Sequence, residues 1–424
     1  MDTFGDLLFI NIYSTGPSLR KTDATVTKMG TNFKFIHCAD LHLGSRFPGI
    51  SAKDPALGKR LTESVFRSFE KIVDTAISEN IDLVVISGDV FDEENETPST
   101  RYRFAKELER LKIPCVISLG NHDHKRSWEE SIRFPENVYV FPSEPTRKII
   151  EINGEKVELL GRSFPSRHTS ENLAASLKGS VDMFTVAVVH CDLDSVSDDD
   201  YAPCKLSDLL GKNVDYWALG HIHKRSEVYS SPHIIYPGNI QGRNSKESGE
   251  KGAYLVTVSN NSVSKLRFVP TQDILWQDLV ISIEGKDLFA IVNEIHNKTK
   301  KGSIISLKMT GKGELDAVLR LDPMGFSDRV STITGCIVSS LDLHTLPPMD
   351  LDVLAQGNNL AANIIRTADH IATMDRTELI NTVCQTRTSA EIRYVFESMS
   401  DEELRSMVMD AEMLILEKLS EGSR

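Results

Sequence analysis

Short apolar runs rich in β-branched residues recur between residues 33 and 219, and each is followed by a polar loop. The runs are Phe33–Cys38, Ile81–Ser87, Ile113–Leu119, Phe184–Val189 and Val214–Leu219. Because they are apolar on both faces, they predict strands that are buried on both sides. The intervening segments Leu61–Asn80 and Tyr102–Leu111 place apolar residues at helical spacing. This alternation predicts a layered α/β fold.

The pattern changes near Pro270. A strand is expected at Leu279–Ile283, a helix at Lys286–His296 and a strand at Ile304–Met309, and from Met349 onward the pattern is almost entirely helical. We therefore expect four parts: a poorly ordered extension over 1–30, a main domain over 31–272, a small α/β capping domain over 273–348 and a helical C-terminal region over 349–424.

Composition narrows the class of protein. A chain of 424 residues exceeds the usual size of one domain. Its 61 acidic and 48 basic side chains leave a net charge of −13, which argues against holding nucleic acid by bulk charge.

No apolar run approaches the length of a membrane span, and Leu7–Ile10 lacks the basic flank of a signal peptide, so a soluble cytoplasmic protein is expected. The six cysteines have no paired spacing, which argues against a disulfide framework or a zinc ribbon.

Candidate metal ligands follow each of the five apolar runs, at the strand ends where open α/β sheets place their sites. The clusters are Asp40-Leu41-His42, Gly88-Asp89-Val90-Phe91-Asp92, Gly120-Asn121-His122-Asp123, His190 and Gly220-His221-Ile222-His223. A single such residue is more often a helix cap or a loop residue. Five clusters at equivalent strand ends indicate one shared centre.

The spacing within the clusters suits this chemistry. In Asp40-x-His42 and His221-x-His223 the two side chains leave the same face of an extended segment, so both can reach one ion. Glycines 88, 120 and 220 let the backbone turn sharply off each strand. Carboxylate, imidazole and amide donors without a thiolate favour Mn²⁺, Fe²⁺ or Zn²⁺, and Mn²⁺ suits the mixed oxygen and nitrogen set best. Two ions in such a centre can hold a hydroxide and clamp a phosphorus atom for in-line attack.

The order of these motifs resembles that of the calcineurin-like metallophosphoesterases. Ala39-Asp40-Leu41-His42-Leu43-Gly44 and Gly120-Asn121-His122-Asp123-His124 are similar to motifs of the SbcD-type DNA repair exonucleases. The segments Tyr201–Cys204, Asp215–His223 and Tyr236–Arg243 resemble the YhaO branch of that family. The resemblance covers residue 33 to about residue 270, and we expect a four-layer α/β/β/α sandwich there.

The resemblance also implies a role for each ligand. One divalent ion would be held by Asp40, His42, Asp89 and His223, and the other by Asp89, Asn121, His190 and His221. His122 would stabilise the phosphorane or protonate the leaving oxygen, a role that suits a side chain titrating near neutral pH. Asp92 and Asp123 would orient such imidazoles. Related archaeal and eukaryotic nucleases carry histidine where this chain has Asp92, so that second histidine role does not carry over.

Cysteine, tryptophan and basic side chains also lie within or near the motifs. Cys38 and Cys191 are expected to be small buried residues and not catalytic thiols, and Trp217 is expected in the core. Some loop cations can either meet a phosphate backbone or remain solvated: Arg162, Arg167, His168, Arg243, Lys246 and Lys251.

The last predicted helix, Ser400–Leu419, opens with a capping box and carries an apolar stripe. The stripe comprises Leu404, Met407, Val408, Ala411, Leu414 and Ile415. It can pack on its own domain or dock a partner.

Our leading hypothesis is a two-metal, Mn²⁺-dependent phosphodiesterase that acts on DNA ends as an exonuclease or endonuclease in DNA repair. The resemblance implies an SMC-like ATPase partner of the SbcC or YhaN kind, which would supply the DNA grip that this acidic chain lacks, and a homodimer is an alternative assembly. A phosphodiesterase for small nucleotide phosphoesters and an inactive scaffold of the same fold remain as alternatives.

Overall fold

A computed structural model describes residues 31–92, 95–123, 132–194, 201–348, 351–384 and 390–422. The expected N-terminal extension over 1–30 lies outside these residues.

Two six-stranded sheets form the main domain. The first has the strand order β14-β13-β1-β2-β3-β4, and the second has the order β11-β12-β10-β7-β6-β5. The strands of the first sheet are β1 (Phe33–Cys38), β2 (Leu83–Ser87), β3 (Cys115–Ser118), β4 (Val138–Val140), β13 (Gly252–Ser259) and β14 (Ser262–Pro270). Those of the second are β5 (Thr146–Ile152), β6 (Glu155–Arg162), β7 (Phe184–His190), β10 (Tyr216–Gly220), β11 (Ser226–Ser230) and β12 (His233–Tyr236). Two short strands, β8 (Asp192–Leu193) and β9 (Pro203–Cys204), pair separately.

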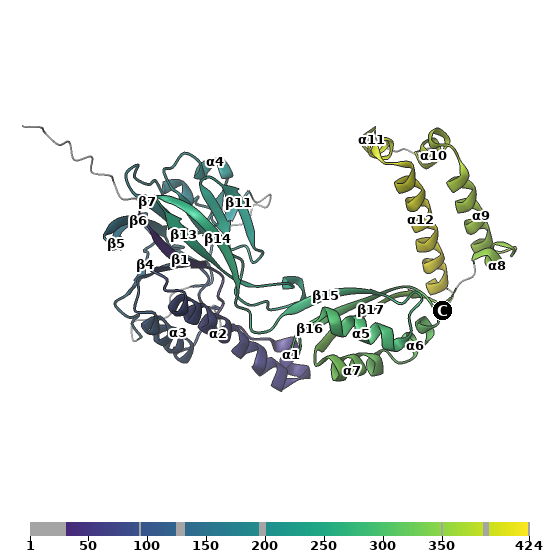
Figure 1. Ribbon diagram of the computed structural model, residues 1–424, viewed down its shortest axis with the longest axis horizontal. Coiled ribbons are helices and arrows are strands. Elements are labelled where there is room, and N and C mark those ends of the chain that lie inside the picture. The colour runs from purple at the N-terminus through teal and green to yellow at the C-terminus, as the bar shows by residue number, and fades with distance from the viewer. Residues whose placement is uncertain are drawn as a thin grey trace, which may run out of the picture.

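Three apolar clusters separate four layers. One lies between the first sheet and helices α2 (Pro55–Ser78) and α3 (Pro98–Leu111), the second lies between the two sheets, and the third covers the outer face of the second sheet beneath α4 (Leu206–Leu209). Figure 1 shows the ribbons of these layers, with α2 and α3 on one side of the two sheets and α4 on the other. All five expected strands are present, and the expected α/β/β/α sandwich is confirmed.

Helix α2 begins six residues before the expected start because Asp54 caps it. The Asp54 side chain accepts a hydrogen bond from the amide of Leu57, and Pro55 occupies the first turn, where its missing N–H costs nothing. The apolar face, which includes Leu61 and Phe69, is buried against the first sheet. A short helix, α1 (Pro48–Lys53), precedes it.

Polar side chains join the two sheets at their centre. The ring of His37 on β1 contacts the hydroxyl of Tyr216 on β10 at 3.0 Å and the Oγ of Ser87 on β2 at 3.1 Å. Ser87 Oγ also donates to the carbonyl of Ala218 at 2.9 Å. Burial lowers the pKa of His37 to about 3, so the ring is neutral. These bonds fix the spacing of the sheets where their central strands end.

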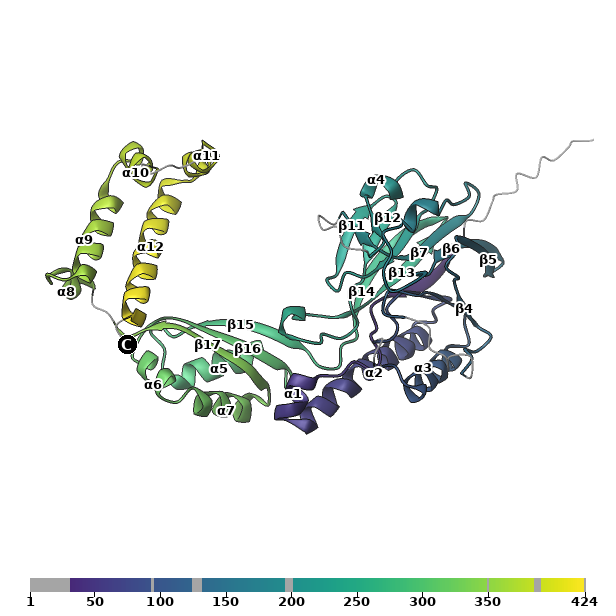
Figure 2. The same ribbon diagram turned by 180° about the vertical axis from the view of Figure 1, so that it is seen from behind.

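A three-stranded parallel sheet follows, formed by β15 (Trp276–Ser282), β16 (Ile304–Lys312) and β17 (Ile337–Leu346). Helices α5 (Leu288–Lys298), α6 (Leu315–Leu321) and α7 (Pro323–Thr334) cover one of its faces, as Figure 2 shows from behind. Asp273 receives ion pairs from Arg67 and Lys71 of α2, which tie the start of this sheet to the main domain.

The C-terminal region is a helical arm of α8 (Leu351–Ala355), α9 (Leu360–Thr373), α10 (Arg376–Val383), α11 (Ala390–Ser398) and α12 (Asp401–Gly422). Helices α9 and α12 lie side by side and run in opposite directions, at the end of the three-stranded sheet away from the main domain (Figures 1 and 2). One buried apolar cluster of the described arm comprises Leu379, Ile380 and Leu404, with other side chains packed at its margin. Among the helices that the structure describes, none has both the length and the hydropathy of a membrane span.

The close approach of the sheets can be tested at Gly220. A Cβ atom at this position would lie 1.7 Å from the carbonyl oxygen of Ser87 in the opposite sheet. We expect Gly220→Ala to lower the free energy of unfolding by about 3 kcal/mol, measured by denaturant titration. Gly49→Ala is the control, since open space surrounds Gly49 in α1 and alanine favours a helix. Equal stability of the two variants would contradict the proposed packing.

Candidate metal centre

The five predicted ligand clusters meet between the carboxyl ends of the two sheets. Strands β1, β2 and β3 of the first sheet lead into Asp40, Asp89 and Asn121, while β7 ends at His190 and β10 leads into His221 in the second. Because each sheet contributes side chains, the centre lies where the sheets face each other and not within one sheet.

The backbone at the ligands is strained. Asp40, His42, Asp89 and His221 all have positive φ angles, of 51°, 46°, 50° and 105°. Such conformations cost non-glycine residues about 1–3 kcal/mol each and persist where the surroundings enforce them. Here the amides of Asp40 and His42 donate to the carbonyls of Gly88 and Asp89 at 3.0 and 2.9 Å, so the two ligand loops hold each other.

The first predicted ligand set converges. Asp40, His42, Asp89 and His223 each offer one donor atom, and these atoms all lie within 4.8 Å of one another. The Nε2 atoms of His42 and His223 are 3.0 Å apart, which is the spacing of two nitrogens bound at a right angle to one ion with bonds of about 2.1 Å. Oδ2 of Asp40 is buried and has no hydrogen-bond partner within the described chain. Such a buried acceptor fits a cation.

Glu247 controls the orientation of His223. Its Oε1 accepts the Nδ1–H of His223 at 2.9 Å, which leaves the Nε2 lone pair of His223 directed toward His42. The other oxygen, Oε2, accepts from the side chain of Asn239 at 2.7 Å and from the amide of Arg243 at 2.8 Å. Burial opposes ionisation of Glu247, but the bond to His223 and the charge of Arg243 lower its pKa to about 2. We did not predict Glu247, because it lies beyond the quoted motifs and no spacing in the sequence points to it.

The second predicted set is partly assembled around His190. The carbonyl of Ser87 accepts the Nδ1–H of His190 at 3.0 Å, so Nε2 faces Oδ1 of Asn121 at 3.1 Å and Oδ2 of Asp89 at 3.5 Å. The ring of His221 packs on the ring of His190, with 5.3 Å between centroids. His221 Nε2 is 4.0 Å from Oδ2 of Asp192. Asp89 therefore lies between the two sets.

The charges of the centre also fit a cation. Burial alone would lower the pKa of His190, but Asp89 and Asp40 outweigh it and raise the value to about 9. A proton on His190 thus neutralises part of the negative charge of Asp89 and Asp40, as a bound divalent ion would. Burial and the neighbouring His190 lower the pKa of His221 to about 3, which keeps His221 in the neutral form that binds metals. The residues fit two ions, and their assignment as ligands stays a prediction.

His122 lies beside the first set without belonging to it. Its amide donates to Oδ1 of Asp89 at 3.0 Å, and its ring contacts the ring of His42 edge-on at 5.1 Å. Donor atoms of His122, His42 and Asp92 lie within 4.8 Å of one another. Nδ1 of His122 is buried and has no hydrogen-bond partner among the described residues. The side chains of His122, His42 and Asp92 could themselves hold an ion, so the structure places His122 beside the metal centre and its action on a substrate stays a prediction.

The two predicted carboxylates have different contacts. Oδ1 of Asp92 is 3.9 Å from Nδ1 of His42, which is too far for the hydrogen bond that an orienting role requires, and this nitrogen has no hydrogen-bond partner within the described chain. Asp123 instead accepts from the backbone amides of Val90, Phe91 and Gly120 at 3.1, 2.9 and 2.8 Å. Burial and the charge of Asp89 raise the pKa of Asp123 to about 7. Asp123 thus joins the loops after β2 and β3.

The three glycines of the motifs lie where a side chain would collide with neighbouring atoms of the centre. Gly88 has a φ of 85°, as the expected turn requires, and a Cβ there would lie 2.3 Å from Nδ1 of His190. At Gly120 a Cβ would lie 2.2 Å from Oδ1 of Asp89. Gly120 and Gly220 are therefore needed for close approach and not for a left-handed turn.

The loop cations are mostly engaged by the protein. Arg243 is half-buried beside the centre, where Nη1 lies 3.7 Å from Asp92 Oδ1 and Nη2 lies 3.8 Å from Glu247 Oε1. The Nζ of Lys251 donates to the carbonyl of His223 at 2.9 Å. Arg162 is buried and forms a two-pronged pair with Glu171 at 2.6 and 2.8 Å, so it is not a solvated loop residue.

Both cysteines beside ligand motifs are buried, as expected. Burial raises the pKa of the Cys38 thiol, and contact with Cys204 together with burial raises that of Cys191. Their sulfurs are therefore protonated and poor ligands. Trp217 is fully buried in the cluster on the outer face of the second sheet, which confirms its place in the core.

We expect Glu247→Gln to weaken Mn²⁺ binding about 10–100-fold, measured by isothermal titration calorimetry. A glutamine can accept from His223 or from Asn239 and Arg243, but its NH₂ group cannot replace the second acceptor. Glu250→Gln is a matched control, since Glu250 is exposed in the same segment. Equal affinity of the Glu247 variant and the wild type would exclude this positioning role.

Comparisons with known proteins agree with this geometry. The pattern of the calcineurin-like phosphoesterase family matches residues 33–225. A Bacillus subtilis protein named uncharacterized metallophosphoesterase YhaO is 38% identical over 314 residues, which cover 71% of this chain and 76% of that protein. The DNA double-strand break repair protein Mre11 of Sulfolobus acidocaldarius is 24% identical over 308 residues, covering 66% and 75% of the two chains. Mre11 of Methanocaldococcus jannaschii is 27% identical over 284 residues, covering 63% and 73%. The chain belongs to the calcineurin-like metallophosphoesterases, a family of metal-dependent phosphoester hydrolases.

Proposed function

We propose that this protein is a two-metal phosphodiesterase that cleaves DNA ends in DNA repair, with the SbcD-like exonuclease or endonuclease activity that the motifs imply. The observation that carries this proposal is the position of His122. Its unpartnered ring nitrogen lies beside a donor set in which Asp89 faces both predicted metal positions. The similarity to proteins named for DNA double-strand break repair supports DNA as the substrate.

We propose Mn²⁺ as the metal because the converging donors are carboxylates, imidazoles and an amide. Asp40, His42, Asp89 and His223 would hold one ion. Asp89, Asn121, His190 and His221 would hold the other. When bound, such ions supply an activated water and Lewis acidity at the phosphorus.

Three side chains outside the two ligand sets also serve the proposed reaction. His122 donates a proton to the leaving oxygen, which is the task of a general acid next to the scissile bond. Asp92 holds the adjacent Arg243 at 3.7 Å, and this guanidinium directs positive charge toward a bound phosphate. Asp123 keeps the loops that carry Asp89 and Asn121 in register through its amide contacts.

The electrostatics favour a partner that supplies the DNA grip. The net charge is −13, Arg243 and Arg162 already contact carboxylates, and Lys251 donates to the carbonyl of His223. DNA affinity at physiological salt depends on phosphate neutralisation, so the chain alone should bind DNA weakly. We propose that an SMC-like ATPase of the SbcC or YhaN kind docks on the helical arm and holds the DNA.

The free state of all six cysteines supports a reducing, cytoplasmic location.

Two substitutions separate metal binding from proton transfer. Asp89→Asn should remove bound Mn²⁺ and turnover together, because Asp89 contacts both ligand sets. His122→Ala should keep the metal content, measured by mass spectrometry of bound ions, while turnover of bis-p-nitrophenyl phosphate falls about 10²–10⁴-fold. Loss of metal in the His122 variant would make this residue a ligand, and near-normal turnover of Asp89→Asn with both ions bound would refute the bridging role.

The substrate class can be tested with the purified protein and Mn²⁺. We expect slow cleavage of end-labelled duplex DNA by the chain alone and a large increase on addition of the ATPase, while hydrolysis of bis-p-nitrophenyl phosphate stays unchanged. Truncation of the chain after Met399 should abolish only the increase in DNA cleavage that the ATPase causes. Hydrolysis of the small diester should remain, because every proposed ligand lies before residue 224. Cleavage of nucleotides in preference to DNA, with or without the ATPase, would instead support a small-phosphoester enzyme.

A further inference from the structure

A cavity opens between three segments of the main domain. Its lining comes from the ends of β3, β4 and β6 and the loops that follow these strands, over residues 119–121 and 123, 140–144, and 163–166. Its volume is about 560 Å³, which lies within the usual range for sites that bind small organic groups.

The cavity borders one side of the metal centre. Asn121 of the second ligand set lines it, and so does Phe164, whose ring contacts the ring of His190 edge-on at 5.5 Å. The described lining includes neither His122 nor a residue of the first ligand set. A substrate bound at the metals therefore reaches this cavity from the side of the second set.

Hydrogen bonds of two buried residues hold the three segments together. The Oγ of Ser163 accepts the amide N–H of Leu119 at 2.8 Å and donates to the carbonyl of Phe141 at 2.5 Å. The amide of Ser163 donates to the carbonyl of Pro142 at 2.8 Å, and the amide of Phe164 donates to that of Leu119 at 3.0 Å. Because Ser163 and Phe164 are buried, these bonds are shielded from water, and the cavity is formed before a ligand binds.

The lining combines apolar walls with polar groups. The apolar walls come from Leu119, Val140, Phe141, Pro142, Phe164 and Pro165. Ser143 and Ser166 add hydroxyl groups, and Glu144 adds an exposed carboxylate. No lysine or arginine belongs to the part of the lining that the structure describes, and Arg162, just before it, is paired with Glu171. The cavity therefore suits a neutral group with apolar faces and hydrogen-bonding edges better than it suits a second phosphate.

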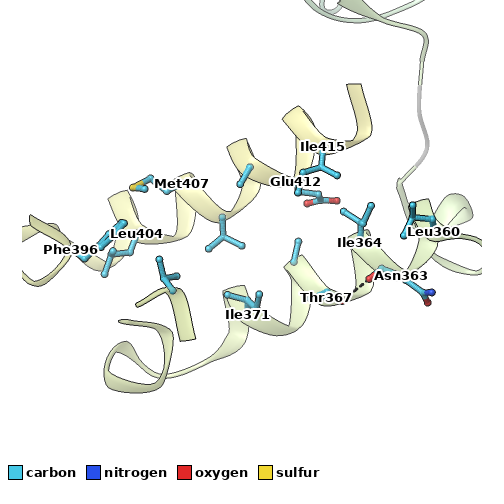
Figure 3. A pocket seen from close by; sticks show the side chains of 14 residues that line it. Leu360, Asn363, Ile364, Thr367, Ile371, Phe396, Leu404, Met407, Glu412 and Ile415 are labelled. Atoms are coloured by element: carbon cyan, nitrogen blue, oxygen red, sulfur yellow. Dashed lines mark hydrogen bonds between the residues drawn. The ribbon is translucent and has the colours of Figure 1, made fainter. Parts of the chain in front are cut away.

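A groove of about 480 Å³ between α9 and α12 has a different character. Figure 3 shows aliphatic side chains of the two helices facing each other across it, such as Ile364 and Ile415, with the carboxyl group of the buried Glu412 between the helices. None of its lining residues belongs to the candidate metal centre, whereas the cavity of the main domain adjoins that centre.

The position of His122 decides which part of a phosphodiester the cavity holds. Hydrolysis forms a bond from phosphorus to the oxygen of water and breaks the bond to one ester oxygen. Water loses a proton, and the leaving oxygen gains one from His122 in the proposed reaction. The other ester oxygen keeps its bond to phosphorus. Because His122 packs on His42 of the first set, while the cavity borders the second set, the group in the cavity is the one that the phosphate retains.

We propose that this cavity binds the nucleoside that stays on the phosphate after cleavage. The inference rests on the proposed function for the phosphodiester reaction. A nucleobase has flat apolar faces, which the proline and phenylalanine walls cover, and a polar edge, which meets Ser143, Ser166 and Glu144. Each base carries an N–H donor on that edge, for which the Glu144 carboxylate is an acceptor. A methyl or glycerol group would leave most of the cavity empty, and a sugar alone offers no flat unsaturated face.

Two chromogenic diesters with the same leaving group test this inference on the full-length protein loaded with Mn²⁺. Thymidine 5′-p-nitrophenyl phosphate retains a nucleoside, whereas methyl p-nitrophenyl phosphate retains only a methyl group. The measured quantity is the ratio of their kcat/KM values. Ser166→Trp places a large ring at the exposed rim of the cavity, and we expect this ratio to fall about tenfold or more, mainly through a higher KM for the thymidine ester.

Ser170→Trp is the matched control. Ser170 is exposed in the same connection between β6 and β7 and lies outside the described lining, so this variant should keep the ratio of the wild type. An unchanged ratio in Ser166→Trp would overturn the inference. Equal slowing of both esters would be such a result, because the cavity would then hold the leaving group.

Binding of phosphate monoesters gives a second readout, without turnover. Isothermal titration calorimetry of the Mn²⁺-loaded protein would use thymidine 5′-monophosphate, glucose 6-phosphate and inorganic phosphate. We expect the nucleotide to bind about tenfold more tightly than the other two, and Ser166→Trp to lose this advantage while Ser170→Trp keeps it. Equal affinity for glucose 6-phosphate would contradict the assignment to a nucleoside. A wild-type protein that binds the nucleotide in this way but hydrolyses neither diester would support the cavity and refute the proposed function.

Discussion

The close approach of two separate β-sheets at the carboxyl ends of their central strands brings the candidate ligands of the metal centre together. Ser87 shows this dependence most clearly. Its hydroxyl donates to Ala218 in the opposite sheet, and its carbonyl accepts the Nδ1–H of His190. The same carbonyl leaves no room for a side chain at residue 220. The contact between the sheets and the orientation of a ligand therefore both depend on Ser87.

Buried polar groups without a partner occur in two regions of the described chain. At the metal centre, the strained backbone of Asp40 and Asp89 and the unpartnered Oδ2 of Asp40 cost stability in the chain alone. In the helical arm, Glu412 has the same cost. In the metal centre a bound cation would satisfy such a group.

The sequence predicted the central strands and the ligand clusters because both depend on local patterns. Buried parallel strands form continuous apolar runs, and ligands at strand ends follow them directly. The edge strands β5, β11 and β14 were not predicted, since they are partly exposed and lack such runs. Their hairpin partners β6, β12 and β13 were not predicted either, although they are largely buried. Glu247 and Glu412 were not predicted because their surroundings depend on contacts between distant segments. Glu247 resembles any loop carboxylate until the fold brings it to His223, and the polar position of Glu412 in an apolar stripe suggests exposure and not burial.

The central claim is that Asp89 lies between two metal ions shared by both sheets. Anomalous diffraction from crystals soaked in Mn²⁺, recorded at the manganese absorption edge, tests it most directly. The account predicts two peaks on opposite sides of the Asp89 carboxylate, one next to His42 and His223 and the other next to Asn121 and His190. A single peak, or a pair of peaks that Asp89 does not join, would contradict it.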